Sequence, residues 1–473
     1  MPKFDTRVQE LRYRVLKEIA KHAYAGDLQE SLLDIPKVIV PGPKPSMRCC
    51  IYKERAIVNE RIALVLKANS KGNNNVINVL PIACDECPLG GYTVSDACRG
   101  CIAHRCSEAC PKKAISFTKD LHASIDKTKC INCGLCAKAC PYGAIENRIR
   151  PCEKACRNNA ISPDPVTNAA KINDEKCIHC GACVYMCPFG AIVDESYILD
   201  IIKMLQNKEK VYALAAPSIA GNFTEFKLGQ VISAIKKLGF ADVVEAALGA
   251  DLVSIHESKE LAERGVLTSS CCPSFISYIK KNYPTLKDFV SSSLSPMATI
   301  AKVIKENEPD AKIVFIGPCT AKKQEIKHSS VSPYVDSVLT FEDLQALIDA
   351  CDINIGSLEE SDFGGKGSTF GRSFAKCGGL TSAVNQALKE QNIDFKVNGI
   401  VCSGNKEIKL ALSDLKNGNS QYNFFEGMMC EGGCIGGPCN LNHSIRNKIC
   451  IDKFSSAGEV DIQTAKDKLK RKK

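Results

Sequence analysis

The sequence predicts an α+β segment built around short cysteine motifs, followed by an α/β domain with mostly parallel strands. The 473-residue chain has 28 cysteines, and 18 of them lie between Cys49 and Cys187. None lies between Cys187 and Cys271, which indicates a domain boundary. Beyond that gap, strand-like stretches (VYALAAP, ADVVEAAL, GVLTSS, AKIVFIG) alternate with amphipathic helical stretches.

Taken in order, the chain divides into four expected parts. Residues 1–80 form a helical and irregular segment, with an amphipathic helix near residues 8–22 and a proline-rich break at 36–45. Residues 81–195 carry the cysteine modules, in which metal clusters replace much of the apolar core. Residues 205–450 form the α/β domain, and 451–473 a basic tail.

Composition excludes several classes of protein. The net charge is +9, but residues 466–473 hold six bases and one acid, so they supply +5 and leave only +4 for the body. That balance argues against nucleic-acid binding. The basic end is expected to be a frayed, solvated tail, with a handle for an acidic partner as the alternative. No stretch is apolar enough to span a membrane, and the start lacks a signal core, so we expect a cytoplasmic protein.

Two cysteine runs share the spacing C-x2-C-x2-C-x3-C-P and similar tails, YGAI and FGAI. They are Cys130, Cys133, Cys136 and Cys140, and Cys177, Cys180, Cys183 and Cys187. This is the spacing of bacterial two-cluster ferredoxins, in which three thiolates bind one [4Fe-4S] cluster and the fourth binds its neighbour. Structural zinc usually takes two separated C-x2-C knuckles, so it fits poorly. Disulfides are rare in a reducing compartment, which also favours metal ligation.

A third, looser unit has the spacing C-x2-C-x4-C-x3-C-P and pairs with the Cys130 unit. By the ferredoxin exchange rule, the two clusters of this pair would take separate ligand sets. One set is Cys98, Cys101, Cys106 and Cys140, and the other is Cys130, Cys133, Cys136 and Cys110.

The partner of the Cys177 unit is a degenerate half, which keeps only the last two cysteines of the pattern. A third cluster would then take Cys156, Cys177, Cys180 and Cys183. Four cysteines remain, Cys84, Cys87, Cys152 and Cys187. They could hold a fourth cluster, and the alternative is a zinc knuckle or free thiols. A row of three or four clusters is suited to passing single electrons.

Several other residues of this half have no ligand role in the pattern. Cys49 and Cys50 are adjacent and stay unassigned. His104 and His179 lie within complete cysteine units, so we expect them outside the ligand sets.

Three segments of the second domain place cysteines in special settings: SSCCP at 269–273, PCTAKKQE at 318–325 and MMCEGGC at 428–434. The first two follow predicted strands, and sites of α/β proteins collect at the carboxyl ends of strands. Cys272, Cys319, Cys430 and Cys434 could therefore converge on one buried cluster. The glycines permit close approach to a bulky group, and Lys322 offers a charged donor.

These segments resemble the three H-cluster signatures of the [FeFe]-hydrogenases, TSCCP, PCxxKxxE and MxCxGGC, in the family's order over residues 211–440. The resemblance implies a two-lobed catalytic domain. It implies that Cys272, Cys319, Cys430 and Cys434 hold the [4Fe-4S] part of the H-cluster. Cys434 would bridge to a diiron subsite with CO, cyanide and azadithiolate ligands.

The resemblance also implies roles for residues around that subsite. Lys322 would hydrogen-bond a cyanide, and Cys271 would pass protons to the bridgehead amine. Glu257, Glu260, Arg264 and Ser291 would carry protons to it; without the resemblance, the helix face of the first three reads as solvated. The pocket lining would include Ala216, Pro217, Ser218 and Met428.

The sequence departs from the commoner branch of the family. Gly317 stands where that branch has Met, Phe275 where it has Trp, and Ser295-Pro296-Met297 and GGPCN replace two further motifs. These changes resemble the divergent group B. Cys439 has no counterpart, and four other cysteines are expected to be buried: Cys351, Cys377, Cys402 and Cys450.

The leading hypothesis is a ferredoxin hydrogenase that interconverts protons and electrons with hydrogen. It would exchange electrons with a ferredoxin or a similar soluble carrier through the accessory clusters, and maturation proteins would supply its diiron subsite. The alternatives are a hydrogenase-like cluster-assembly carrier without a diiron subsite, and a hydrogen sensor. Retention of Cys271, Lys322 and Glu257 argues against the carrier, which needs none of them.

Overall fold

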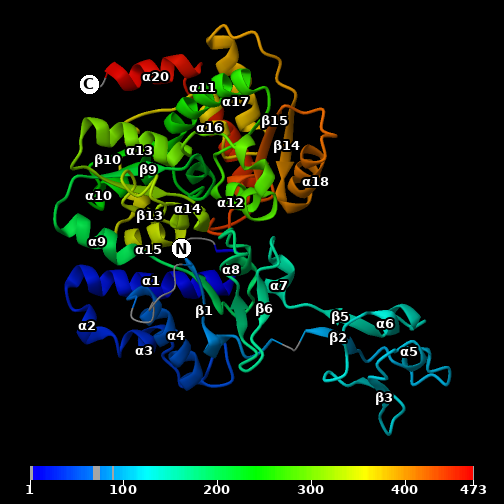
Figure 1. The fold of residues 1–473 in the computed structure, drawn as a ribbon. Helices are drawn as coiled ribbons and strands as arrows, with labels where there is room; N and C mark the ends of the chain where they lie inside the picture. Colours follow the sequence, from blue (N-terminus) through cyan, green and yellow to red (C-terminus); the bar gives the residue numbers. More distant parts are fainter. Residues whose placement is uncertain (1–3, 68–74, 88–89, 472–473) are drawn as a thin grey trace.

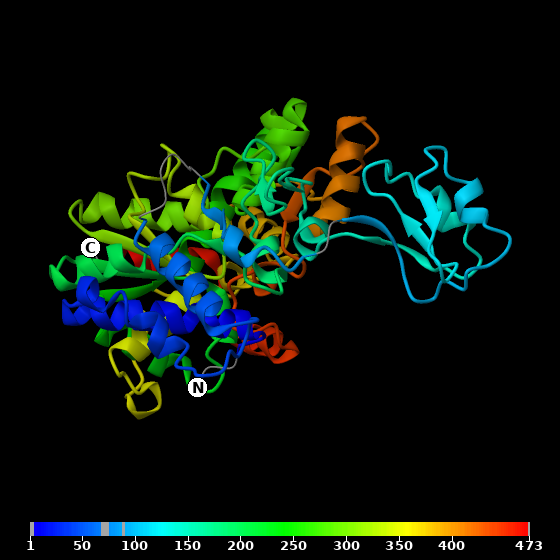
Figure 2. The same ribbon diagram turned by 90° about the horizontal axis from the view of Figure 1, so that it is seen from below.

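The computed structural model describes residues 4–67, 75–87 and 90–471, with side chains to residue 467. An α/β body carries the N-terminal helices along one side, and a small cysteine module projects from it (Figures 1 and 2). The predicted α+β modules followed by a two-lobed α/β domain are confirmed. Within the described ranges, no helix is both long and apolar enough to cross a bilayer.

Four helices form the N-terminal segment: α1 (Arg7–Ala25), α2 (Leu28–Ser31), α3 (Ile35–Ile39) and α4 (Ile51–Val65). Helix α1 begins where the Thr6 side chain accepts a hydrogen bond from Gln9 N, and it ends at Gly26, whose φ of 82° suits glycine. The predicted amphipathic helix is therefore confirmed. Its apolar face packs on α3 and α4 and against the α/β body through α15 (Phe341–Ala350) and α9 (Ile198–Gln206).

The projecting module spans residues 91–148. Its elements are β2 (Gly91–Val94), α5 (Arg105–Glu108), β3 (Ile115–Phe117), β4 (Ala123–Ile125), α6 (Leu135–Ala139) and β5 (Ile145–Arg148). Strand β2 pairs antiparallel with β5, and β3 with β4. The core is small and includes the buried thiols of Cys106 and Cys136, as expected where clusters replace apolar side chains.

A second module lies against the body. Its elements are β1 (Ile77–Val79), η1 (Pro81–Ala83), α7 (Pro151–Ala155), β6 (Ile161–Pro163), β7 (Ala170–Ile172), α8 (Ala182–Met186) and β8 (Ile192–Asp194). Strand β1 pairs antiparallel with β8, and β6 with β7. This module is thus made from two stretches of chain that flank the projecting one.

The first lobe of the α/β domain has a parallel sheet of order β10-β9-β12-β13. The strands are β9 (Val211–Ala215), β10 (Asp242–Glu245), β12 (Lys312–Ile316) and β13 (Ser337–Leu339). Strand β9 is buried on both faces, as parallel strands usually are. The helices of this lobe are α9, α10 (Leu228–Lys237), α11 (Ala246–Arg264), α13 (Pro296–Asn307), α14 (Thr320–Glu325) and α15, with η2 (Pro217–Gly221) and η4 (Ile355–Ser357).

The second lobe has a parallel sheet of order β11-β15-β14. The strands are β11 (Leu267–Thr268), β14 (Gly399–Ser403) and β15 (Phe424–Met428), and the surrounding helices are α12 (Pro273–Asn282), η3 (Pro284–Phe289), α16 (Thr369–Ser373), α17 (Gly379–Glu390), α18 (Gly404–Lys416) and η5 (Cys434–Gly436). Each of the strands β11, β12 and β15 is followed directly by a cysteine motif, and residues of all three motifs line one cavity. The carboxyl ends of these strands therefore meet between the lobes.

The prediction of a frayed tail at residues 466–473 is wrong for residues 466–471, because helix α20 (Ile462–Arg471) continues through them. Helix α19 (Ile445–Ser456) precedes it. Ile451, Ile462 and Ala465 are buried, and the Glu390 carboxylate accepts hydrogen bonds from the first backbone amides of α20. Because the end of the chain is rich in lysine, its few apolar side chains did not indicate packed helices.

A buried ionic network joins the N-terminal helices, the second module and the α/β domain. Lys323 Nζ lies 2.7 Å from Asp194 Oδ2 and 3.2 Å from Asp343 Oδ2. Arg12 pairs with Asp194 and lies 3.1 Å from Glu342. All five side chains are almost fully buried, so each charge depends on the others.

Replacing Lys323 with methionine is expected to destabilise the protein by about 3–5 kcal/mol, because two carboxylates would stay buried without this cation. The measurement is the midpoint of urea unfolding. Lys327→Met is the control: Lys327 pairs with Glu195 at 2.8 Å but is about a third exposed, so its loss should cost about 1 kcal/mol or less. Equal effects of the two substitutions would contradict a structural role for the network.

Candidate active site and metal clusters

Four cysteines from both lobes meet between the two sheets. Cys272 follows β11 and precedes α12, Cys319 follows β12 and precedes α14, and Cys430 and Cys434 follow β15. The Cys434 thiol lies close enough to the other three thiols for their charges to interact, which is called electrostatic reach below. The structure therefore brings together the four thiols that the sequence predicted for the H-cluster cubane.

The loop that carries Cys434 needs glycine at position 433. Its φ is 96°, and a Cβ there would lie only 2.8 Å from the Ala375 carbonyl oxygen and 2.9 Å from Cys377 N. The absence of a side chain lets the loop approach the backbone of residues 375–377 closely.

An apolar cavity of about 90 Å³ lies beside Cys434. Its lining includes the four predicted pocket residues, Ala216, Pro217, Ser218 and Met428, together with Cys271 and Lys322. The Ser218 hydroxyl is fully buried and has no hydrogen-bond partner among the described residues. Lys322 Nζ is bonded to Glu325 at 2.7 Å. A bridging thiol, a buried cation and a free hydroxyl around an apolar space fit a diiron subsite with cyanide ligands.

A series of polar and titratable side chains, joined in part by hydrogen bonds, runs from this cavity toward the surface. Cys271 precedes Cys272, a predicted cluster ligand, and its thiol lies close enough to Glu257 for their charges to interact. Glu257 Oε1 accepts hydrogen bonds from the backbone amide and the hydroxyl of Ser270, at 2.9 and 2.8 Å. The series thus begins at the cavity wall.

The outer half of the series starts at Ser291, which contacts both glutamates. Its hydroxyl donates to Glu260 Oε2 at 2.9 Å and also interacts with Glu257. Arg264 donates to Glu260 Oε1 at 2.5 Å and is a third exposed. The face of α11 that carries both glutamates is thus buried rather than solvated, because β11 and the segment around Ser291 cover it.

The two carboxyl groups of this series differ in acidity. Burial raises the pKa of Glu257 to about 7, and the hydrogen bonds from Ser270 oppose this rise only in part. Burial would also raise the pKa of Glu260, but hydrogen bonds from Ser292 N, Ser291 and Arg264 outweigh it and lower that pKa. Glu257 can therefore exchange a proton near neutral pH.

The accessory cysteines gather in sets that match the predicted exchange. Cys106 is in electrostatic reach of Cys101 and Cys140. Cys136 is in electrostatic reach of Cys130 and Cys110. In the second module, Cys183 is in reach of Cys177, Cys180 and Cys156. In the described ranges, no group of three or more His, Cys, Asp or Glu side chains lies close enough together to hold a metal ion.

Arg157 lies between the second module and the cavity, and sequence reasoning missed it. Its Nη1 donates to the Met429 carbonyl and lies 3.5 Å from Cys430 Sγ, while its charge also reaches Cys180. The guanidinium therefore lies between one predicted accessory ligand set and the predicted H-cluster ligands. The available signal was a departure: Arg157 stands where the other three units have proline after their last cysteine.

Glu426 on β15 was also missed. It is fully buried, accepts hydrogen bonds from Gly378 N and from Thr381, and lies within electrostatic reach of Cys271. Burial raises its pKa. Glu426 stands two residues before the MMCEGGC motif, so the motif spacing did not point to it.

The remaining thiols and histidines have structural surroundings. Cys50 accepts a hydrogen bond from Lys53 N at the start of α4, and Cys49 is exposed. Of the four cysteines expected to be buried, Cys402 is, whereas Cys351, Cys377 and Cys450 are partly exposed. Cys439 is fully buried beside the Arg12 and Lys323 network. His104 stacks on Phe117, and His179 lies 3.0 Å from Asn75.

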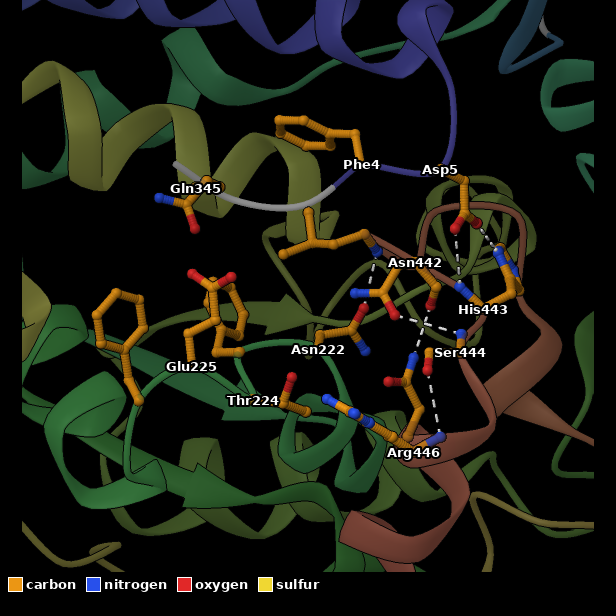
Figure 3. Close-up of a pocket in the computed structure, with 14 residues that line it drawn as sticks. Phe4, Asp5, Asn222, Thr224, Glu225, Gln345, Asn442, His443, Ser444 and Arg446 are labelled. Carbon is orange, nitrogen blue, oxygen red and sulfur yellow. Dashed lines mark hydrogen bonds and ion pairs between the residues drawn. The ribbon is translucent and has the colours of Figure 1, made fainter.

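A larger cavity, of about 610 Å³, lies away from the cysteines. Phe4, Asp5, Glu225, His443 and Arg446 line it, and Asp5 faces His443 (Figure 3). Its lining mixes Phe4, Phe223, Phe226 and Leu441 with amide and charged side chains, and it contains no cysteine. We therefore place the reaction at the smaller, apolar cavity, where the thiols meet.

The comparisons with known proteins agree with this geometry. Residues 209–438 match the family described as iron only hydrogenase large subunit, C-terminal domain. Residues 123–146 match a 4Fe-4S binding domain, and residues 150–191 match a 4Fe-4S dicluster domain.

Three relatives share long alignments with the chain. The periplasmic [Fe] hydrogenase large subunit of Nitratidesulfovibrio vulgaris is 30% identical over 378 residues, 66% of this chain and 85% of the relative. Iron hydrogenase 1 of Clostridium pasteurianum is 28% identical over 409 residues, 73% of this chain and 70% of the relative. The NADP-reducing hydrogenase subunit HndD of Solidesulfovibrio fructosivorans is 28% identical over 389 residues, with 68% and 65% covered.

Proposed function

The chain belongs to the iron-only hydrogenase family, and from this membership we propose that it catalyses the reversible combination of two protons and two electrons to hydrogen. Its cofactors are an H-cluster and accessory [4Fe-4S] clusters. The observation that supports the activity best is the apolar cavity in which Cys434, Lys322 and Cys271 meet, with a series of titratable side chains running from it to the surface.

We propose the following division of work among the residues. Cys272, Cys319, Cys430 and Cys434 hold the H-cluster, which supplies the redox-active iron when bound. Lys322 and Ser218 present donors that fix the orientation of the diiron subsite. The apolar lining excludes water, and so protons reach the cavity only through Cys271.

The proton path runs from the surface inward. Arg264 is half of an ion pair at the outer end, and Glu260 with Ser291 connects that end to Glu257. Glu257 holds a proton near neutral pH and passes it through Ser270 to the Cys271 thiol. Hydrogen bonds join Ser270 to Glu257 and Ser291 to Glu260, and the step from Ser270 to Cys271 requires a side-chain movement.

We propose that electrons come from a ferredoxin or a similar soluble carrier in the cytoplasm, and that maturation proteins insert the diiron subsite. The projecting module supports this, since it presents clusters away from the body (Figure 2). Relatives named as periplasmic and as NADP-reducing show that other compartments and carriers occur among similar proteins. The carrier of this chain is therefore part of the proposal.

Infrared spectroscopy of anaerobically purified, diiron-loaded protein tests the activity. We expect sharp bands in the window of metal-bound CO and cyanide, and we expect them to shift under hydrogen. Amino acids and simple iron–sulfur clusters do not absorb there. A Cys434→Ser variant, which lacks the bridging thiolate, should show no such bands.

An empty window for the wild-type protein, with its cubanes intact by electron paramagnetic resonance, would contradict the proposal. It would favour the alternative function, a cluster carrier without a diiron subsite.

A further inference from the structure

We propose that Cys84, Cys87, Cys152 and Cys187 bind a fourth accessory [4Fe-4S] cluster. They do so in a two-cluster fold that is split in sequence, because the whole projecting module, residues 91–148, is inserted between its second and third cysteines. This inference goes beyond the proposed function, since it holds for either direction of the reaction and for a carrier as well.

The two modules contain the same elements in the same order. The projecting module runs from β2 through Cys98 and Cys101 to α5, β3, β4, α6 and β5. The module on the body runs from β1 through Cys84 and Cys87, then from α7 through β6, β7 and α8 to β8. In each, the first strand pairs antiparallel with the last. The C-x2-C knuckle that looked left over thus occupies the place of the first two cysteines.

Backbone hydrogen bonds repeat at matching positions. After β2, Ser95 N donates to Ala144 O at 2.8 Å, and after β1, Leu80 N donates to Ala191 O at 2.7 Å. These bonds fix the start of each knuckle against the end of its own module. The same kind of backbone hydrogen bond therefore positions the knuckle at Cys84 and the knuckle at Cys98.

Hydrogen bonds to sulfur repeat as well. Ala123 N, at the start of β4, donates to Cys98 Sγ at 3.5 Å, and Ala170 N, at the start of β7, donates to Cys84 Sγ at 3.3 Å. Amide donors of this kind stabilise the thiolates of iron–sulfur clusters. A free thiol needs no such donor.

The last cysteine of the set shows the same bond. Ala191 N donates to Cys187 Sγ at 3.2 Å, as Ala160 N does to Cys156 at 3.1 Å. Cys187 is thus presented as a ligand, like the cysteine already placed in the third cluster.

Three of the four cysteines, Cys84, Cys152 and Cys187, lie in one buried cluster of side chains. Cys152 is in electrostatic reach of Cys187, Cys84 and Cys87. Cys87 is in turn in electrostatic reach of Cys84 and Cys187. Three of the four are buried, with exposed fractions of 5–7%. By the exchange rule of two-cluster ferredoxins, this set completes the module whose other cluster takes Cys156 and the three Cys177-unit thiols.

A buried cation that forms no ion pair with any described residue lies beside the set. Arg61 is 5% exposed, donates from Nη2 to Gly190 O, and reaches the charge of Cys187. Its Nε and Nη1 have no hydrogen-bond partner in the described part of the chain. A buried guanidinium is costly unless it is paired, and a cluster held by four thiolates carries the negative charge that would pair with it.

The position of this cluster suits it to transfer electrons between the projecting module and the rest of the protein. Both connections to the projecting module start here, because residue 91 follows Cys87 closely and Cys152 follows residue 148. On the other side, Cys152 is in reach of Cys183, whose set includes Cys180, and Cys180 is in reach of Cys430. The fourth cluster therefore bridges the projecting module and the cluster next to the active site.

Metal analysis of the full-length holoprotein tests the assignment. The Cys84→Ser plus Cys87→Ser variant should lose about four irons and four inorganic sulfides per chain. Cys49→Ser, which alters an exposed thiol of the same half, should lose none. Loss of about one zinc instead of iron would overturn the proposal in favour of a zinc knuckle, and no loss of metal would show free thiols.

A second variant keeps the test decisive if the double variant does not fold. Arg61→Gln leaves all thiols in place but removes the cation beside Cys187. In a redox titration followed by electron paramagnetic resonance, we expect one cluster to shift to a more negative potential, because its reduced, more negative state loses a stabilising charge. Iron content should stay unchanged. Potentials identical to wild type for every cluster would contradict a cluster at this position.

Discussion

Replacing Cys271 with alanine is expected to reduce hydrogen turnover by about 10²- to 10⁴-fold, the usual contribution of a positioned proton donor. The thiol lines the cavity beside Cys434 and is the last titratable group of the path from Glu257. Since Cys271 ligates no iron in the proposed site, the infrared bands of CO and cyanide should remain. The measurement is hydrogen evolution from a reduced artificial donor, together with that spectrum.

Cys402→Ala is the matched control for the loss of a buried thiol. Cys402 is 3% exposed and lies on β14, outside the cavity lining. Its replacement should leave turnover near the wild-type rate. Unchanged turnover in Cys271→Ala would contradict the proposed path, and loss of the infrared bands would show that Cys271 helps to hold the cofactor.

Replacing Glu257 with glutamine is expected to lower turnover by a similar factor, because the amide still accepts a hydrogen bond from Ser270 but cannot carry a proton. The pH profile separates this role from a structural one. Since burial raises the pKa of Glu257 to about 7, the wild-type profile should change near pH 7. The variant should lack that feature at every substrate concentration, and a profile that keeps it would assign the titration to another group.

The same substitution changes the pH dependence of stability. A raised pKa means that the folded protein binds more protons at this site than the unfolded chain does between about pH 4.5 and 7. The unfolding free energy therefore falls as the pH rises through this window, by about 3 kcal/mol for this group. Glu257→Gln should lack this fall between pH 5 and pH 8 in urea unfolding.

Glu260→Gln provides the comparison with opposite sign. Its neighbours lower the pKa of Glu260, so its carboxylate stabilises the folded protein above the unfolded pKa, and this contribution is lost only as the pH falls toward the folded value. Glu260→Gln should therefore keep the fall that Glu257→Gln loses. The same slope in both variants would contradict the raised pKa of Glu257.

Much of this molecule could be predicted from its sequence because cluster ligands are held by local spacing. The run at Cys130 and the motif at Cys430 each fix several ligands within a dozen residues, and the glycines that permit close approach stand in the same motif. The alternation of strands and helices after residue 211 predicted the parallel sheets for the same reason. Structure that depends on residue spacing within one short segment can therefore be read from the sequence.

What the sequence did not reveal depends on contacts between distant segments. Arg157 lies at Cys430, and Arg61 lies at Cys187, yet neither pair is near in sequence. The split module could not be recognised either, since 64 residues separate Cys87 from Cys152. The C-terminal helices were missed because three buried side chains, among many lysines, decide their packing.

The antiparallel pairing of Gly91 with Arg148 places the two ends of the projecting module side by side. A unit whose ends meet can be exchanged as a cassette, because its host needs only a short link in its place. A hydrogenase built in this way can acquire a new redox partner by replacing one cassette. Its hydrogen-activating core and the cluster next to it would keep their own folds throughout that exchange.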